Sequence, residues 1–353
     1  MVKQADKILK VGIAGYGKMG RLRHDIIKRH HPQMSVKAVC DPFLKAAPDG
    51  ILGFTDPADF MRQDLDVIFV CTPNHASPAI VIEALNGGRH VFCEKPPGRT
   101  EQDVLDMMAA ERANPTLKLK FGFNHRYHHV IREARALVDS KSLGEILWVR
   151  GVYGKTGSED FEQQWRNNRT ISGGGILLDQ GIHMVDLCRY FLGDFKDIHA
   201  MVTRSFWKNI DVEDNAFALM KTADDRVAML HSSSTHWKHK FLLEIFLTDG
   251  YLVIDGILSQ TNSYGMGRES LKVARKRLDL QGKYLGNPQE EVRYFTDDAS
   301  WQMEIDDFLD AVLNNRPVTQ GCSSEALEVM KLVHRIYEAD PSWSAVSKEA
   351  GAS

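Results

Sequence analysis

Residues 8–15 (ILKVGIAG) and the residues that continue them, 16–20 (YGKMG), decide the fold of this chain. The first run is apolar and typical of a buried strand, and residues 18–30 have the apolar spacing of a helix. Between them lies the pattern GxGxxG. Its first glycine permits a tight turn, its second lets a pyrophosphate approach the backbone, and its third lets the helix pack on the strand. The helix then offers free N–H groups to phosphates.

An acid at the end of the next strand supports this interpretation. Asp41 stands 21 residues beyond Gly20 and closes the run 35–41. A carboxylate there is placed to accept hydrogen bonds from an adenosine ribose, whereas a 2′-phosphate would meet like charge. Residues 42–44 (PFL) supply no arginine for such a phosphate. The pattern therefore predicts NAD rather than NADP; the alternatives are a glycine turn without a ligand and a surface acid.

The first third of the chain alternates predicted strands and helices. Strands are predicted at 8–15, 35–41, 66–72, 90–95 and 117–123, and helices at 18–30, 77–88 and 100–113. Thr100 and Asp103 form a predicted capping pair for the third helix. This alternation indicates a parallel sheet with helices on both faces.

After Asn124 the pattern changes to consecutive strands. They are predicted at 145–155 and near 197–206, 212–221, 226–237, 240–248 and 251–255, with helices at 127–139, 175–192, 301–314 and 322–339. Strands without intervening helices favour an antiparallel or mixed sheet. We therefore predict an α/β chain with an N-terminal Rossmann dinucleotide-binding domain at 1–123. A C-terminal α+β domain at 124–353 has a large, mostly antiparallel open sheet, and its last helices can pack back on the first domain.

Composition excludes some partners. The chain has 353 residues, with 44 Lys and Arg against 47 Asp and Glu. Its net charge of -3 gives it no excess of positive charge with which to bind nucleic acid or an anionic membrane. Residues 257–298 are expected to be polar and irregular. Their basic patch is interpreted as a solvated loop or hairpin rather than a nucleic-acid site; its members are Lys272, Arg275, Lys276 and Arg277.

Targeting and redox signals point to the cytoplasm. The N-terminus shows no secretory pattern, and no apolar run approaches the length of a membrane span. The five cysteines include no CxxC pair, so we interpret them as reduced core residues.

Two polar motifs close neighbouring strands. CTPNH at 71–75 follows one strand, and EKP at 94–96 follows the next. Ligands of open α/β sheets bind at strand carboxyl ends, so Thr72 and Asn74 are candidates for cofactor contacts and Lys95 is expected to point its ammonium toward a nicotinamide. The alternatives are helix capping for the first motif and a surface lysine for the second.

A further motif, GGGILLDQGIH at 173–183, joins an acid to a histidine. Asp179 and His183 are four residues apart and share one face of a helix. A carboxylate beside an imidazole supports its protonated form, and histidine can accept a hydroxyl proton near neutral pH. The alternative is a capping aspartate with a buried, satisfied histidine.

Two groups of histidines lack a zinc pattern: His125, His128 and His129, and His231, His236 and His239. His231 and His236 are an odd number of positions apart, so a regular strand would turn them to opposite faces. We predict no bound metal.

Together these motifs resemble the Gfo/Idh/MocA family (glucose-fructose oxidoreductase, inositol dehydrogenase and rhizopine catabolism protein) over almost the whole chain. The matches are GYGKMG, Asp41, CTPNH, EKP, NHR at 124–126 and the GGG…DxxxH block. The resemblance implies an NAD(P)-dependent dehydrogenase acting on a sugar, sugar derivative, sugar nucleotide or cyclitol. It also implies a homodimer or homotetramer assembled through the open face of the second sheet.

The resemblance assigns roles to individual residues. His183 would take a hydroxyl proton, Lys95 would orient that oxygen, and Asp179 would position His183. The predicted cofactor site comprises Gly15, Tyr16, Gly17, Lys18, Met19, Gly20, Asp41, Thr72, Pro73, Asn74, His75, Glu94 and Lys95. The predicted substrate site comprises Lys95, Arg126, Tyr153, Trp165, Arg166, Asp179 and His183, whose aromatic and polar groups suit a sugar ring.

Two other functions stay open. Some relatives oxidise a sugar transiently at a tightly bound NAD, eliminate a group and reduce the product again. Others are dinucleotide-sensing regulators, which tend to lose the residues that match Lys95, Asp179 and His183. The sequence does not identify the sugar, the oxidised carbon or the direction of reaction.

Overall fold

The computed structural model describes residues 8–259 and 268–344. Its contacts divide the chain into two compact units. The first comprises the described residues up to Asn124 together with Thr170–Gly173 and Trp301–Met330, and the second comprises His125–Arg169, Gly174–Ser300 and the residues from Lys331 onward.

The first unit is built on a six-stranded parallel sheet with the order β3-β2-β1-β4-β5-β6. Its strands are β1 (Leu9–Ala14), β2 (Met34–Cys40), β3 (Leu52–Phe54), β4 (Val67–Val70), β5 (His90–Glu94) and β6 (Leu119–Gly122). The strand order reverses between β1 and β4, so the carboxyl ends of these strands flank the crevice where such sheets bind ligands.

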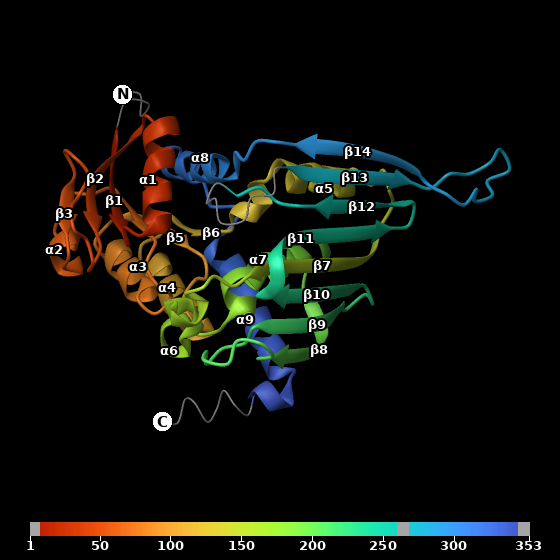
Figure 1. Ribbon diagram of the computed structural model, residues 1–353. Helices are drawn as coiled ribbons and strands as arrows, with labels where there is room; N and C mark the ends of the chain where they lie inside the picture. The colour runs from red at the N-terminus through yellow and green to blue at the C-terminus, as the bar shows by residue number, and fades with distance from the viewer. Residues whose placement is uncertain (1–7, 260–267, 345–353) are drawn as a thin grey trace. The chain divides into compact units, whose positions relative to one another are not determined.

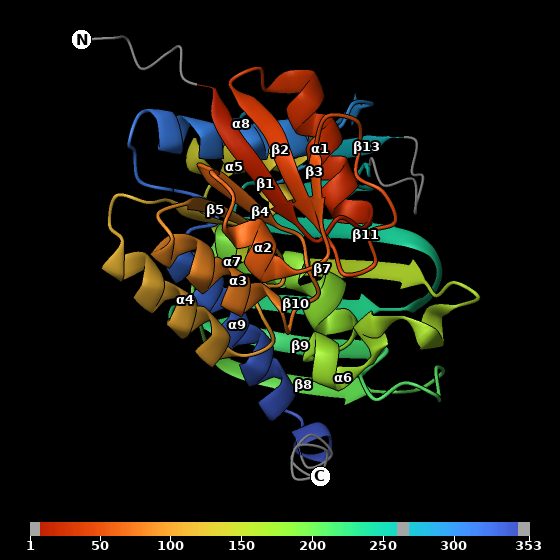
Figure 2. The ribbon, with the colours of Figure 1, turned by 90° about the vertical axis from the view of Figure 1, so that its left-hand side faces the viewer.

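Helices cover both faces of this sheet. In Figure 2, α1 (Lys18–His30) and α8 (Ser300–Leu313) lie on one face, and α3 (Ser77–Asn86) and α4 (Glu101–Ala113) lie on the other. The predicted capping box of α4 is present, because Thr100 accepts from the Asp103 N–H and the Asp103 side chain accepts from the Thr100 N–H. The short β3 and α2 (Pro57–Met61) were not predicted.

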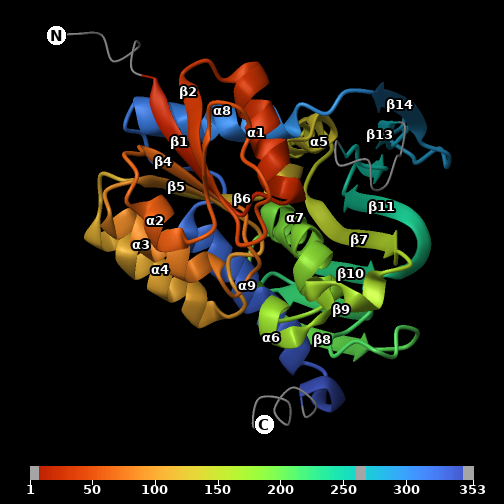
Figure 3. The same cartoon turned by 60° about the vertical axis from the view of Figure 1, so that its left-hand side comes forward.

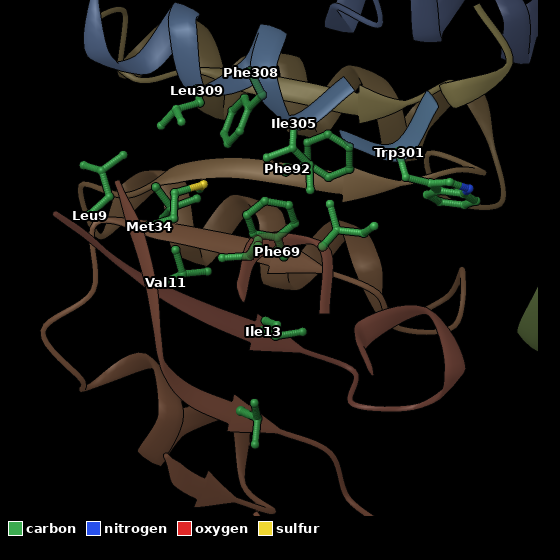
Figure 4. Packing of buried hydrophobic residues seen from close by; sticks show 14 of the residues in the cluster. Leu9, Val11, Ile13, Met34, Phe69, Phe92, Trp301, Ile305, Phe308 and Leu309 are labelled. Carbon is green, nitrogen blue, oxygen red and sulfur yellow. The ribbon is translucent and has the colours of Figure 1, made fainter. Parts of the chain in front are cut away.

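The core between the sheet and α8 is aromatic (Figure 4). Phe69 of β4 and Phe92 of β5 stack with ring centroids 5.0 Å apart. Phe308 of α8 meets both rings edge-on, and Trp301 and Ile305 extend the contact. Burying such side chains contributes roughly 1.5–3 kcal/mol each. This contact explains why the segment that contains α8 belongs to the first unit.

The second unit contains an eight-stranded sheet with the order β14-β13-β12-β11-β7-β10-β9-β8 (Figure 1). Every neighbouring pair is antiparallel except β10 with β7. The strands are β7 (Ile146–Thr156), β8 (Phe195–Thr203), β9 (Asn215–Thr222), β10 (Val227–Ser233), β11 (Thr235–Leu247), β12 (Gly250–Asp255), β13 (Glu269–Arg275) and β14 (Gln289–Phe295). The sheet is thus the predicted mostly antiparallel one.

One face of this sheet is covered by helices. Figure 3 shows α7 (Ile182–Leu192) against β7 and β10. Gly151 of β7 makes this approach close, because a Cβ there would lie 2.4 Å from the Met184 sulfur. The helix α5 (His129–Asp139) lies near β12 and β13, and α9 (Ser323–Glu338) follows α8 in the chain.

Two expectations about this unit were wrong. Residues 257–298 are not wholly irregular, because β13 and β14 pair within them, and Lys272 and Arg275 lie on β13. His231 and His236 do not face opposite sides of one strand. The chain turns between β10 and β11, and their rings come 5.4 Å apart.

Candidate active site

The glycine turn between β1 and α1 leaves space for a ligand. Gly15 has a φ of 85°, and a Cβ there would lie 2.5 Å from the Cys71 carbonyl oxygen. A Cβ on Gly20 would lie 2.0 Å from the Gly15 carbonyl oxygen. Gly17 differs, because no atom lies within 4 Å of its Cβ position, and it begins α1 without a side-chain cap. The start of α1 thus has open space beside Gly17 and no side-chain cap, which fits the pyrophosphate of a dinucleotide.

The Asp41 carboxylate ties the end of β2 to this turn. The Tyr16 N–H donates to Asp41 Oδ2 at 2.9 Å, and the Phe43 N–H donates to Oδ1 at 2.9 Å. A carboxylate has about four acceptor positions, so lone pairs remain for a ribose diol. The carboxylate thus shapes the turn and keeps capacity for the predicted ribose contact.

The motif after β4 holds the segment Thr170–Gly173. Asn74 donates through Nδ2 to the Ser172 carbonyl at 2.7 Å, and the His75 N–H donates to the Ile171 carbonyl at 3.1 Å. Thr72 Oγ1 lies 3.1 Å from Ser77 Oγ. These contacts have structural roles, and the cofactor roles of Thr72, Pro73, Asn74 and His75 stay predictions.

Glu94 enters a buried ion cluster that the sequence reasoning missed. Arg23 of α1 donates to Glu94 Oε1 at 2.6 Å and to Glu304 Oε2 of α8 at 2.7 Å. Burial raises the pKa of Glu304 to about 7. Arg23 follows Gly20 by three positions on the face that also holds Ile26 and Ile27, and this apolar spacing was the available signal. Lys95 follows Glu94, is half-buried, and forms a cis peptide with Pro96.

In the second unit, a π-helical turn at Leu177–Gly181 carries Asp179. Lys155 donates to Asp179 Oδ2 at 2.9 Å, and Arg166 donates to Oδ1 at 3.3 Å. The sequence reasoning placed Arg166 near this acid and missed Lys155. Lys155 lies two positions beyond Tyr153 on β7, so the strand period puts both on one face.

The imidazole of His183 stacks on that of His125, with centroids 3.7 Å and planes 13° apart. His183 is only 4% exposed. His125 Nε2 in turn lies 3.1 Å from the Tyr153 hydroxyl. The structure therefore groups His183 with His125 and Tyr153, and a common substrate site for His183 and Tyr153 stays a prediction.

A buried carboxylate positions the turn that carries Asp179. Glu213 accepts from the N–H groups of Gly175 and Leu177, at 2.8 and 2.9 Å, and from the Tyr337 hydroxyl at 2.7 Å. Burial raises the pKa of Glu213. A Cβ on Gly175 would lie 2.2 Å from the Glu213 carbonyl oxygen, which explains one glycine of the triple-glycine run.

Two arginines predicted at the substrate have different environments. Arg166 is half-buried, and its guanidinium lies 4.4 Å from the centroid of the Trp165 ring. Arg126 is 2% exposed and forms a bidentate pair with Asp186 of α7, at 2.8 and 2.6 Å. That pair gives Asp186 a structural role, and a substrate contact by Arg126 stays a prediction.

Within residues 8–259 and 268–344, no group of three or more His, Cys, Asp or Glu side chains is arranged to hold a metal ion. No helix there combines the length and apolar composition that crossing a bilayer requires. All five cysteines are free thiols, and burial raises the pKa of Cys40 to about 11 and of Cys188 to about 12.

Comparison with known families covers both units. Residues 9–121 match the model of an oxidoreductase family with an NAD-binding Rossmann fold, and residues 131–253 match the GFO/IDH/MocA C-terminal domain. The chain belongs to the Gfo/Idh/MocA family. This Gfo/Idh/MocA protein is an oxidoreductase with an NAD-binding Rossmann domain, and its six-stranded sheet and glycine turn lie within that domain.

Relatives of this Gfo/Idh/MocA chain include proteins named as sugar and cyclitol dehydrogenases. Levoglucosan dehydrogenase of Pseudarthrobacter phenanthrenivorans is 25% identical over 288 residues, which are 70% of this chain and 73% of the relative. Myo-inositol 2-dehydrogenase of Thermotoga maritima is 23% identical over 265 residues, covering 72% and 77%. A levoglucosan dehydrogenase structure in complex with NADH and L-sorbose superposes with a TM-score of 0.81 at 20% identity, covering 96% and 98%, and shows the same fold.

Proposed function

We propose that this protein is an NAD-dependent dehydrogenase that oxidises a secondary hydroxyl of a sugar, sugar derivative or cyclitol. The observation that carries the proposal is that both units match the family, while Lys95, Asp179 and His183 all retain the residue types of its catalytic motifs. Relatives named as levoglucosan and inositol dehydrogenases support the substrate class.

The residues of the first unit would hold NAD through its pyrophosphate and ribose. The open space at Gly17 suits the pyrophosphate, and Asp41 suits the adenosine ribose. When bound, NAD supplies the acceptor for the hydride that leaves the substrate carbon. We favour NAD over NADP because the Asp41 carboxylate would repel a 2′-phosphate.

The remaining steps are assigned to side chains. His183 accepts the hydroxyl proton as general base, a role that contributes about 10²–10⁴-fold in enzymes. Lys95 donates to the substrate oxygen and stabilises its developing negative charge. Asp179, held by Lys155 and Arg166, orients the substrate and His183. Trp165 and Tyr153 offer aromatic surface to the apolar face of a sugar ring.

A screen for NAD reduction tests this function. The purified protein is incubated with NAD and separately with levoglucosan, myo-inositol, aldoses, amino sugars and nucleotide sugars, and NADH is measured by absorbance. At least one compound is expected to yield NADH, with NADP slower. NAD that copurifies with the protein without net NADH would instead favour transient oxidation followed by elimination. One relative named as a 2,7-anhydro-N-acetylneuraminate hydratase, 27% identical over 201 residues, makes this the second candidate.

We also propose that copies of the chain associate through the face of the second sheet opposite α7. Since Gly151 meets α7, its neighbours on β7 point the other way. That face carries Trp148, Phe246 and Tyr251 stacked across three strands, with Leu219 and Met229 47% and 46% exposed. An exposed apolar patch of this kind marks an interaction site. Five free thiols, of which Cys40, Cys93 and Cys188 are buried, and the use of NAD suit a cytoplasmic protein.

A further inference from the structure

The buried ion cluster around Arg23 has no role in the proposed reaction as described so far. The Arg23 side chain is 0% exposed, and its partners Glu94 and Glu304 are 10% and 0% exposed. Three separate segments supply them, because Arg23 lies on α1, Glu94 ends β5 and Glu304 lies on α8. One guanidinium thus binds two carboxylates away from water.

The surroundings hold this guanidinium in one place. It lies 4.4 Å from the centroid of the Phe92 ring and 4.7 Å from that of Trp301. Gly122 of β6 leaves space for the Arg23–Glu94 pair, because a Cβ there would lie 3.0 Å from Glu94 Oε2 and 3.3 Å from Arg23 Nη2. Rings, carboxylates and backbone therefore fix the guanidinium from several sides.

Stability alone is a weak explanation for such a cluster. Removing charges from water is costly, and well-packed apolar residues in place of a buried ion pair are often as stable or more stable. A bidentate, planar group does, however, fix its partners in one geometry. The cluster is therefore better explained by what it holds in place.

What it holds is the backbone from which Lys95 projects. Glu94 is the last residue of β5, and side chains of successive residues leave a strand on opposite faces. Anchoring Glu94 to the α1 side therefore fixes the peptide that leads into Lys95. The same Arg23 lies on the helix that begins at the glycine turn.

We infer that Arg23 and Glu304 are positioning residues for Lys95. Through Glu94 they connect α1 and α8 to the end of β5, from which Lys95 follows. This inference rests on the proposed role of Lys95, but its structural part can be measured without any substrate.

The test compares Arg23→Lys, Glu304→Gln and the control Glu111→Gln with the unaltered protein. Arg23→Lys keeps the charge and loses the fork that binds two carboxylates, and Glu304→Gln keeps the shape and loses one charge. Glu111, a carboxylate of α4 in the same unit, accepts from Ser323 and belongs to a different contact. Lysines are labelled by reductive methylation with carbon-13, and the Lys95 signal is assigned by its loss in Lys95→Arg.

The Lys95 signal is expected to shift or broaden in Arg23→Lys and Glu304→Gln, and to be unchanged in Glu111→Gln. With levoglucosan and myo-inositol as probes, kcat of Arg23→Lys is expected to fall about 10- to 100-fold, as for a misplaced catalytic group, while KM for NAD changes less than about threefold. If Arg23→Lys fails to fold, the Lys95 signal and kcat of Glu304→Gln decide whether the cluster positions Lys95.

The inference is overturned if both cluster variants keep the Lys95 signal and the kcat of the unaltered protein and lose no more Tm than Glu111→Gln. The cluster would then have only a structural role. If the unaltered protein oxidises neither probe, the Lys95 signal alone decides the positioning. The proposed function is then judged separately by the NAD-reduction screen.

Discussion

At the scale of single residues, Asp41 has two tasks in one carboxylate. It accepts from the Tyr16 and Phe43 N–H groups, so it shapes the glycine turn before any cofactor arrives. Its negative charge is the feature that would discriminate between cofactors, because a 2′-phosphate is repelled and a ribose diol is not. An asparagine at this position removes the charge and keeps one of the two acceptor oxygens, so the comparison of NAD with NADP separates these two tasks.

The Asp41→Asn variant should bind NAD about tenfold more weakly, a loss of about 1.4 kcal/mol. Its affinity for NADP should fall less, because the like charge is gone. Titration calorimetry with both cofactors measures this, with Asp49→Asn as a control at an exposed carboxylate of the same unit. An equal loss for NAD and NADP would mean that Asp41 acts only by shaping the turn.

Glu304 makes stability depend on pH. Burial raises its pKa to about 7 in the folded protein, from an ordinary value of 4.5. Between these values the folded state holds a proton that the unfolded state has lost, so the free energy of unfolding falls as pH rises through this window and levels off above it. The Tm of the unaltered protein should therefore decline from about pH 5 to 7 relative to that of Glu304→Gln. Parallel Tm curves for the two proteins would contradict this assignment.

At the scale of elements, the turn at Leu177–Gly181 depends on backbone approach rather than on helix propensity. Gly175 lies against the carbonyl of Glu213, whose carboxylate caps the turn. Because Asp179 lies on this turn, its position depends on a residue 38 positions away from Gly175 in the chain.

A Gly175→Ala substitution should therefore displace Asp179. We expect a destabilisation of about 1–3 kcal/mol, as for overpacking in a well-packed interior. Thermal unfolding and kcat at saturating NAD check this, and both should fall. Gly282→Ala, at a glycine of positive φ with no atom near its Cβ position, is the control and should lower Tm slightly without changing kcat. Unchanged kcat in Gly175→Ala would show that the turn tolerates the shift.

Elements that depend on residues close together in the chain were predictable from the sequence. Elements and contacts that depend on residues far apart in the chain were not. The helix at 18–30 and the capping box of Thr100 and Asp103 follow from neighbouring residues and are present. The strand β14 lacked the alternation that identifies a strand, because its residues are exposed on both sides. Likewise, Arg23 and Glu304 are 281 positions apart, so their pairing needed the fold.

At the scale of the whole molecule, the chain contains a dinucleotide-binding unit and a unit built on an open sheet. One face of that sheet receives α7, and the other presents the stacked Trp148, Phe246 and Tyr251. On this face Arg150, whose side chain is 46% exposed, pairs with Glu244, so the two opposite charges add no net charge to a contact with another copy.

The Met229→Asp variant should therefore weaken association. A charge in the middle of an apolar interface is costly to desolvate, so light scattering after size exclusion should report a smaller assembly than for the unaltered protein. Leu280→Asp, at a side chain 101% exposed near the β13–β14 connection, is the control and should leave the assembly intact. An assembly of unchanged mass in Met229→Asp, or a monomeric unaltered protein, would contradict the proposed interface.

The proposed roles of His183 and Lys95 are tested by comparing NADH formation by the unaltered protein with that by His183→Ala and Lys95→Ala. On the polyol that the screen identifies, both variants should lose about 10²–10⁴-fold in kcat while binding NAD with an affinity close to that of the unaltered protein. Variants that form NADH as fast as the unaltered protein, or an unaltered protein that forms none with any polyol, would contradict the account.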